Sequence, residues 1–174
     1  MGAIHEFEAE KLVVGVIYHN EEVLENALML LKEEFGEVDM VSPDYSFSQG
    51  FSTYYDGELG GEGMRRIYSF DALVDPSLQV EIKEFTNAIE AKFERRINLD
   101  PGLISHGRLM LPTTKPTGFR IALARGIYTE PTLFWARGAW HKFPWTYRDY
   151  QSERVQKFLV RVRKKYLLQR KEDL

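Results

Sequence analysis

The feature that most constrains the fold is a short apolar run followed directly by an amphipathic segment. Lys11 to Tyr18 is almost wholly apolar and rich in β-branched residues, so it predicts a buried central strand. In Glu21 to Phe35 the apolar residues recur at helical spacing, with Asn20 placed to cap this helix and Gly36 placed to end it. Gly15 stands alone within the strand and cannot supply the nest of backbone amides that a phosphate-binding loop needs. The sequence therefore predicts a strand–helix unit that lacks a phosphate loop.

Elements of the same two kinds follow along the chain. Val38–Val41 and Met64–Phe70 predict strands, and Asp75-Pro76 opens a second amphipathic helix that we expect to reach about Arg96. The remaining β-rich segments are Leu103 to Thr114, Phe119 to Ala124, and Ile127 to Trp135 continuing into Ala139 to Phe143, and a last helix begins at Ser152. The first six elements match the ferredoxin-like order of strand, helix, strand, strand, helix, strand.

This order predicts the fold class. We expect a single α+β domain over residues 1–174, with its core in 11–166 and frayed ends at 1–10 and 169–174. The sheet is expected to be mainly antiparallel, with a ferredoxin-like start, added C-terminal hairpins, a final helix, and helices packed on one face. A chain of 174 residues is long enough to bury a sizeable core without metals or disulfides.

The long segment from Ser42 to Gly63 is rich in Ser, Gly, Tyr and Asp, with aromatic residues interspersed. We expect a strand around Phe51 to Tyr55 and a mobile turn at Glu58 to Gly63. A loop of this length and composition either packs on the sheet, which we favour, or covers a ligand, or contacts another subunit.

Composition excludes several classes of protein. There is no cysteine, which removes disulfides, thiol nucleophiles and Cys-ligated zinc. The N-terminus lacks a secretory signal pattern, and no apolar run approaches the length that spans a bilayer. We therefore expect a cytoplasmic protein that does not associate with membranes.

The net charge of −3 hides a strong asymmetry. Residues 1–90 carry 19 acidic against 5 basic side chains, whereas residues 91–174 carry 18 basic against 7 acidic ones. Such asymmetry marks either a nucleic-acid or anion partner, or two halves whose charges interleave into ion pairs, as in charge-rich thermostable proteins. We favour ion pairing, because a pI near 5.9 is unusual for a dedicated nucleic-acid domain.

Most polar side chains that could act together fall between Asn98 and Tyr150. Asp100 precedes Pro101-Gly102 and either caps its own turn, which we favour, or serves as a carboxylate base or cation ligand. Thr113-Thr114-Lys115 brings two hydroxyls and an ammonium to a strand end, and Arg120 adds a forked donor across the predicted hairpin. This combination suits a phosphate, although a hairpin that merely ends in polar residues has the same pattern.

Glu130 shares a strand face with Tyr128 and Thr132, so it is either a second candidate base or a partner in a structural ion pair. The aromatic run from Trp145 to Tyr150 offers rings for stacking a base or sugar, although we favour a plug that anchors the last helix. The four histidines lack ligand-like spacing, and we expect no metal site. The candidate catalytic residues are Glu130 and Asp100, and the candidate ligand-binding residues are Asn98, Thr113, Thr114, Lys115, Arg120, Tyr128, Trp145, Tyr147 and Asp149.

Several short motifs together resemble a family of uncharacterised bacterial and archaeal proteins that is catalogued as a domain of unknown function. The resemblance covers about Lys11 to Tyr166. Its motifs are Val14-Gly15-Val16-Ile17-Tyr18, Phe85-Thr86-Asn87, Asn98-Leu99-Asp100-Pro101-Gly102, Thr113-Thr114-Lys115, Gly126-Ile127-Tyr128-Thr129-Glu130 and Trp145-Thr146-Tyr147-Arg148-Asp149-Tyr150. Some members are labelled GTP-binding, but this chain has neither a P-loop nor a guanine-reading Asn-Lys-x-Asp run. The resemblance brings no established activity, and it leaves the cofactor unknown.

These observations favour a protein that binds an anionic small molecule, a nucleotide or a phosphorylated metabolite, in a pocket built from the stretch between residues 98 and 150. Phosphoester or nucleotide chemistry would use Glu130 or Asp100 as general base, with Lys115 and Arg120 stabilising negative charge. One alternative is a non-catalytic homo-oligomer, such as a homodimer, that associates through the loop from Tyr45 to Tyr55. Another, which we favour least, is nucleic-acid binding through the basic face of the last helix.

Overall fold

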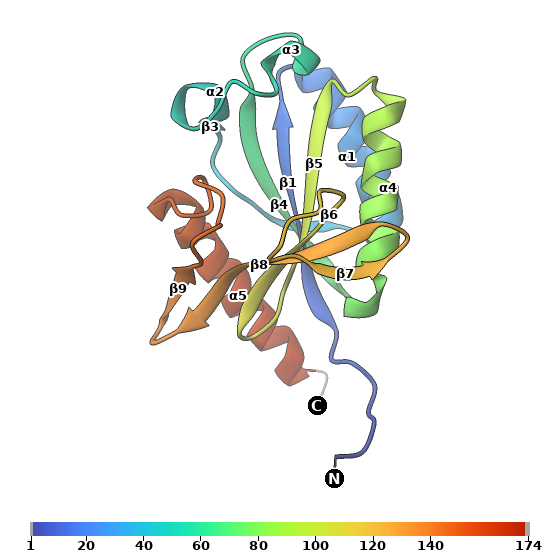
Figure 1. Cartoon of the computed structure of the whole chain (residues 1–174), viewed down its shortest axis with the longest axis vertical. Helices are drawn as coiled ribbons and strands as arrows, with labels where there is room; N and C mark the ends of the chain where they lie inside the picture. Colours follow the sequence, from blue (N-terminus) through green and yellow to red (C-terminus); the bar gives the residue numbers. More distant parts are fainter. Residues whose placement is uncertain (1, 173–174) are drawn as a thin grey trace.

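The first half of the chain forms a four-stranded antiparallel sheet with two helices. The computed structural model describes residues 2–172, and Figure 1 shows their arrangement. The first elements are β1 (Glu10–Tyr18), α1 (Glu21–Phe35), β2 (Val38–Val41), β4 (Met64–Val74), α4 (Gln79–Lys92) and β5 (Ile97–Ile104). The strands lie in the order β2-β4-β1-β5, and each pair is antiparallel. The α+β class and its ferredoxin-like start are confirmed.

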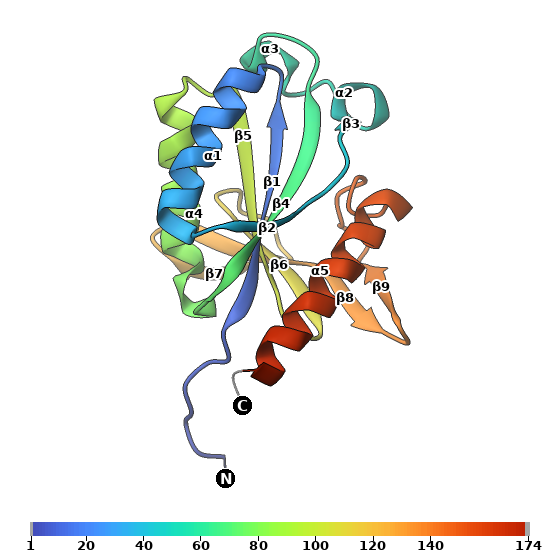
Figure 2. The same ribbon diagram turned by 180° about the vertical axis from the view of Figure 1, so that it is seen from behind.

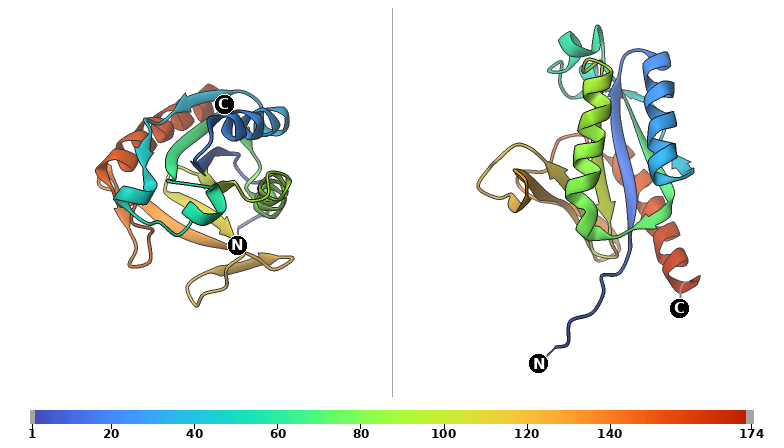
Figure 3. Two further views of the ribbon diagram at one scale, coloured as in Figure 1. Left: turned by 90° about the horizontal axis from the view of Figure 1, so that it is seen from above. Right: turned by 90° about the vertical axis from the view of Figure 1, so that its right-hand side faces the viewer.

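The second half extends this sheet with hairpins. Its elements are β6 (Arg108–Thr113), β7 (Ile121–Ala124), β8 (Ile127–Ala136), β9 (Ala139–Lys142) and α5 (Glu153–Glu172). The sheet continues as β5-β6-β8-β7, and β9 pairs with β8. Both two-residue turns, Arg125-Gly126 and Arg137-Gly138, have positive φ at each position, as the tight turns of hairpins require. The hairpin of β7 and β8 stands away from the body beside α4 (Figure 3), and its tip is held there by an ion pair between Arg125 and Glu81 at 2.7 Å.

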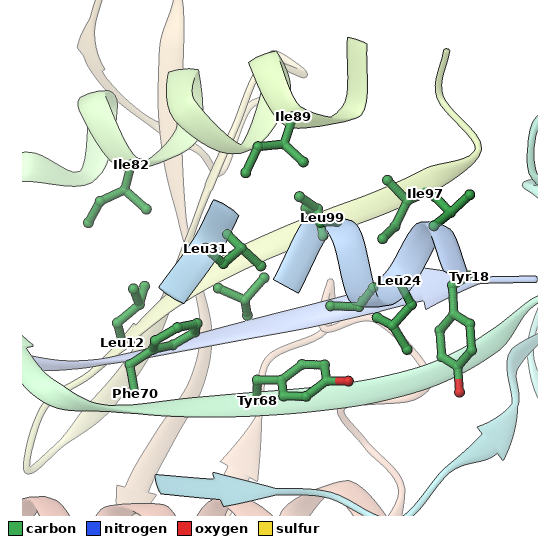
Figure 4. Packing of buried hydrophobic residues seen from close by; sticks show 14 of the residues in the cluster. Leu12, Tyr18, Leu24, Leu31, Tyr68, Phe70, Ile82, Ile89, Ile97 and Leu99 are labelled. Atoms are coloured by element: carbon green, nitrogen blue, oxygen red, sulfur yellow. The ribbon is translucent and has the colours of Figure 1, made fainter. Parts of the chain in front are cut away.

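Two cores lie on opposite faces of the sheet. Leu12, Val14 and Val16 of β1 pack with α1 and α4 on one face, as Figure 4 shows for Leu12. Val13 of β1 packs on the other face with α5, through residues such as Leu159. The expectation that the helices share one face was therefore wrong for α5 (Figure 2). The reason lies in β1, which is apolar at successive positions and so needs cover on both sides.

The segment between β2 and β4 is more ordered than its composition predicts. It contains β3 (Tyr45–Ser46) and two one-turn helices, α2 (Phe47–Gly50) and α3 (Asp56–Leu59), and the strand expected around Phe51 to Tyr55 is absent from the described chain. Tyr45 is buried in the core beside α5, and Phe47 and Phe51 pack against it. Packing on the sheet therefore anchors this segment, which lies at the end of the sheet where β5 begins (Figure 1).

The ends of the later helices also differ from expectation. A 3-10 turn (Pro76–Leu78) precedes α4, and α4 ends at Lys92 because Glu94 and Arg95 adopt left-handed backbone angles. Helix α5 runs to Glu172 instead of fraying from residue 169, and Gln169 accepts a hydrogen bond from Lys11 Nζ at 2.8 Å. Of the ends expected to fray, residues 1, 173 and 174 lie outside the described part of the chain.

Candidate functional site

The sheet splits between β5 and β6. Strand β5 pairs with β1 over eight residues, but it pairs with β6 only through Leu103 and Ile104. Pro101 has no N–H to offer, so a ladder with β6 cannot continue at this position. Gly102 marks the point where β5 and β6 cross closely, because a Cβ there would lie 2.6 Å from Leu111 Cδ2. Beyond this crossing the two strands diverge and leave space between them.

Side chains of helix α4 form hydrogen bonds with the backbone of β5 where β6 no longer pairs with it. The Leu99 N–H donates to Glu90 Oε1 at 2.7 Å, and Lys83 Nζ donates to the Leu99 carbonyl at 3.3 Å. Asn98 Nδ2 also donates to Glu90 Oε1, at 3.3 Å. The turn that we expected at Asp100-Pro101-Gly102 was therefore wrong. The Pro-Gly pair lies inside β5, where two side chains of α4 replace a neighbouring strand.

A cavity of about 340 Å³ occupies the split. One side is α4, which contributes Lys83, Asn87, Glu90 and Ala91. The walls are Asn98 and Asp100 of β5 and the segment from Leu111 to Lys115 at the end of β6. The remaining sides comprise Ile17, Phe47, Tyr54, Tyr55, Arg65, Arg95, Glu130, Tyr147, Asp149 and Tyr150. Residues from seven helices and strands, together with loop residues, therefore line one cavity of the size that small-molecule sites have.

Arg65 holds two carboxylates at the back of this cavity. Its guanidinium is buried and lies 2.8 Å from Asp100 Oδ2 and 3.3 Å from Asp149 Oδ2. Tyr45 also donates to Asp149, at 3.3 Å. Gly15 provides the room, because a Cβ there would approach Arg65 Nη2 to 2.9 Å. Arg65 lies on β4, so this cluster links β4 to β5 through Asp100 and to the segment before α5 through Asp149.

Two ammonium groups line the cavity without a carboxylate within ion-pair distance among the described residues. Lys83 is only 8% exposed, and the Leu99 carbonyl is the acceptor that the described chain offers it. Lys115 lies at the open side, with its Nζ 5.5 Å from the centre of the Tyr54 ring. A buried ammonium carries three donors, so Lys83 has hydrogen-bonding capacity left for a ligand.

Glu130 lines the cavity, and Arg120 holds its carboxylate. Both Nε and Nη2 of Arg120 lie 2.8 Å from Glu130 Oε2. Arg120 also donates to Tyr147 Oη at 3.0 Å and to the Lys115 carbonyl at 2.6 Å. Burial raises the pKa of Glu130, and Arg120 offsets part of this rise. Glu130 is 1% exposed, and its Oε1 has no hydrogen-bond partner in the described structure.

Three of the tyrosines that line the cavity have a raised pKa. Burial raises the pKa of Tyr55, Tyr147 and Tyr150, and the negative charge of Asp100 raises each of them further. Burial also raises the pKa of Glu90, and the negative charge of Asp100 raises this pKa further. Asp100 is therefore close enough to act on groups from several walls of the cavity.

Of the residues proposed from the sequence, most meet in this cavity. Those that line it are Asn98, Asp100, Thr113, Thr114, Lys115, Glu130, Tyr147 and Asp149. Arg120, Tyr128 and Trp145 do not line it, although Arg120 binds three residues that do. Trp145 instead stacks between Phe119 and Phe143 and donates to the Pro131 carbonyl. Tyr150 is buried beside α5, as an anchor for that helix would be.

Sequence reasoning missed the cavity residues that precede Asn98. They are Phe47, Tyr54, Tyr55, Arg65, Lys83, Asn87, Glu90 and Arg95. A signal did exist in α4, where Lys83, Asn87 and Glu90 recur at the spacing of one helical face. Thr86, by contrast, donates to the carbonyl of Lys83 and has the local role expected of it. No sequence signal distinguishes Arg65 from the neighbouring Arg66.

The rest of the charge pattern is explained by ion pairs between the two halves. Basic residues of the second half pair with acidic residues of the first, as in the contacts of Lys165 with Asp39 and Asp71 at 2.9 and 2.8 Å. Within residues 2–172, no group of three or more His, Asp or Glu side chains is placed to hold a metal ion. None of the helices in that range has the length and apolar character needed to cross a bilayer.

The fold and the cavity define a class of protein: an α+β chain whose antiparallel sheet splits to form a polar, ligand-sized pocket. A family model described as a domain of unknown function, DUF4416, matches residues 8–166, so the chain belongs to this family. No curated protein and no solved structure matches the chain.

Proposed function

We propose that this protein binds an anionic small molecule, a nucleotide or a phosphorylated metabolite, in the cavity between β5 and β6. The observation that carries the proposal is Lys83, a buried ammonium that lines the cavity and has a backbone carbonyl as its acceptor in the described chain. Glu90 is near enough for Lys83 to lower its pKa, but the two groups do not reach ion-pair distance, and a buried cation without a direct ion pair is costly. A ligand phosphate at this position would neutralise it and accept its remaining donors.

The open side of the cavity supports the same ligand class. Lys115 provides a second ammonium there, and the hydroxyl groups of Thr113 and Thr114 lie beside it in the lining. Lysine binds phosphate as a point charge from several directions, so Lys115 can follow a ligand into the cavity. The rings of Phe47 and Tyr55 provide apolar surface for the rest of the ligand.

The two carboxylates proposed as general bases differ in accessibility. The Asp100 side chain is 31% exposed and borders the cavity, whereas Glu130 is almost completely buried behind it. If the bound ligand reacts, Asp100 is therefore the better placed base. Glu130 is better suited to position Arg120 and Tyr147.

The two alternative functions have less support. Tyr45 and most of the aromatic loop pack inward, and Tyr54 is its exposed member at 73%, so little of this loop is free to form a subunit contact. On α5, Lys157 and Lys165 are engaged in ion pairs with carboxylates of this chain.

Isothermal titration against nucleoside phosphates and sugar phosphates tests the proposal. We expect Lys83→Met and Lys115→Ala each to weaken binding by about ten-fold or more, because each removes a charge-assisted contact of roughly 1.5–3 kcal/mol. Lys164→Ala is the matched control, since this exposed lysine lies on α5 away from the cavity. If Lys83→Met folds normally and binds phosphates as tightly as wild type, the proposed site is wrong.

A further inference from the structure

The cavity is bipolar, because a cluster with surplus negative charge and two ammonium groups without an ion-pair partner among the described residues line different sides of it. Arg65 is one cation between two carboxylates, Asp100 and Asp149, so this cluster retains one negative charge. Lys83 and Lys115 line other sides of the same cavity, and neither is within ion-pair distance of a described carboxylate. A ligand that carried only negative charge would satisfy the lysines and leave the cluster at Arg65 unbalanced.

The two carboxylates of this cluster are not equivalent. Asp149 is buried, and its oxygens accept from Arg65, the Tyr45 hydroxyl and the Tyr150 N–H. Asp100 accepts from Arg65 through Oδ2, and its side chain remains partly exposed on the cavity wall. Asp100 is therefore the carboxylate that can accept from a ligand.

Two further acceptors among the cavity-lining residues lack donors. Glu130 is buried, with Oε1 unpartnered while Oε2 is held by Arg120. Asn98 Oδ1 is also buried and unpartnered, and its orientation is fixed because the amide nitrogen must face the carboxylate of Glu90. Buried acceptors without donors are rare in folded proteins, so each calls for a partner that this chain does not provide.

We propose that the ligand is a phosphate ester that also carries an amino group, and that Asp100 binds this group while Lys83 and Lys115 bind the phosphate. This inference rests on the proposed function, and it narrows the ligand class to molecules with both a cationic amino end and an anionic end. A charge-assisted hydrogen bond between the amino group and Asp100 would balance the cluster at Arg65.

Matched ligand pairs test this inference. We would measure binding of 2-aminoethyl phosphate against 2-hydroxyethyl phosphate, and of 3-aminopropyl phosphate against 3-hydroxypropyl phosphate, by isothermal titration. We expect wild type to prefer the amino member of at least one pair by about ten-fold. The ratio between paired ligands is measured on the same protein, so a modest change in folding cancels.

The variant Asp100→Asn should abolish this preference while retaining phosphate binding, and Glu33→Gln, a surface carboxylate outside the cavity, should leave it unchanged. Equal binding of both members of each pair to wild type would overturn the inference and leave the proposed function intact. A preference that survives in Asp100→Asn would overturn the role of Asp100. If none of the four phosphates binds, the result contradicts both proposals.

Discussion

Replacing Glu90 tests whether a carboxylate substitutes for a missing strand at the split. Glu90 Oε1 accepts from the buried Leu99 N–H at 2.7 Å and from Asn98 Nδ2 at 3.3 Å. Glu90→Gln keeps an oxygen at this position, whereas Glu90→Ala leaves the Leu99 N–H buried without an acceptor. An unsatisfied buried donor costs about 1–3 kcal/mol. We therefore expect the alanine variant to be less stable than the glutamine variant by about that amount.

The charge of Glu90 predicts a second difference. Burial raises the pKa of this carboxyl, against the opposing effects of the Leu99 N–H and Lys83. Because its pKa is higher in the folded state, the folded protein binds the proton more tightly, and stability falls as pH rises from the ordinary value of 4.5 through the folded pKa. Glu90→Gln cannot titrate, so its stability should be flatter in this window. Its deficit relative to wild type should be larger at pH 4 than at pH 7.

Urea unfolding followed by circular dichroism, from pH 4 to pH 8, measures both effects. For a chain of this length each kcal/mol corresponds to roughly 2–4 °C in Tm, so thermal scans give an independent check. Glu33→Gln controls for the loss of a surface carboxylate. If Glu90→Ala and Glu90→Gln agree within about 0.5 kcal/mol, Leu99 has found another acceptor and Glu90 does not replace a strand.

Two further predictions concern buried charges near the core. Burial raises the pKa of Asp39, but hydrogen bonds from Lys11 (2.5 Å) and Lys165 outweigh this effect and lower the pKa below 3.8. The ionised Asp39 therefore stabilises the fold above that pH, and its contribution is lost as the pH falls through the pKa of the folded state. Asp39→Asn should lose roughly 3–5 kcal/mol at pH 7 and show a shallower acid limb in urea titrations from pH 2 to 7; parallel limbs would refute the assignment. Gly15→Ala should lose about 1–3 kcal/mol in the same assay, because its Cβ would press on Arg65. The control Gly57→Ala has open space around it and should not lose stability.

Local patterns in the sequence were sufficient to predict most elements. Helix α1 begins and ends where its periodicity, the Asn20 cap and Gly36 indicated, because capping and amphipathicity act within a few residues. The order of strands and helices likewise led to the ferredoxin-like sheet. Residues 113–115 were singled out because polar side chains at a strand end are visible in the sequence alone. Glu130 was singled out from its strand face, and Tyr147 from the aromatic run that contains it.

Only the tertiary structure decided that β5 and β6 separate and that side chains of α4 replace β6 as the hydrogen-bonding neighbour of β5. The residues responsible lie on two neighbouring elements, Lys83 and Glu90 on α4 and Pro101 on β5, and the sequence does not show how these elements pack. A Pro-Gly pair also reads locally as a turn. Arg65 gains its role from Asp100 and Asp149, each of them at least 35 positions away. Local sequence thus determined the elements, since their energetics are local. The pocket depends on long-range contacts, because ordinary charged residues form a site only where the fold buries them together.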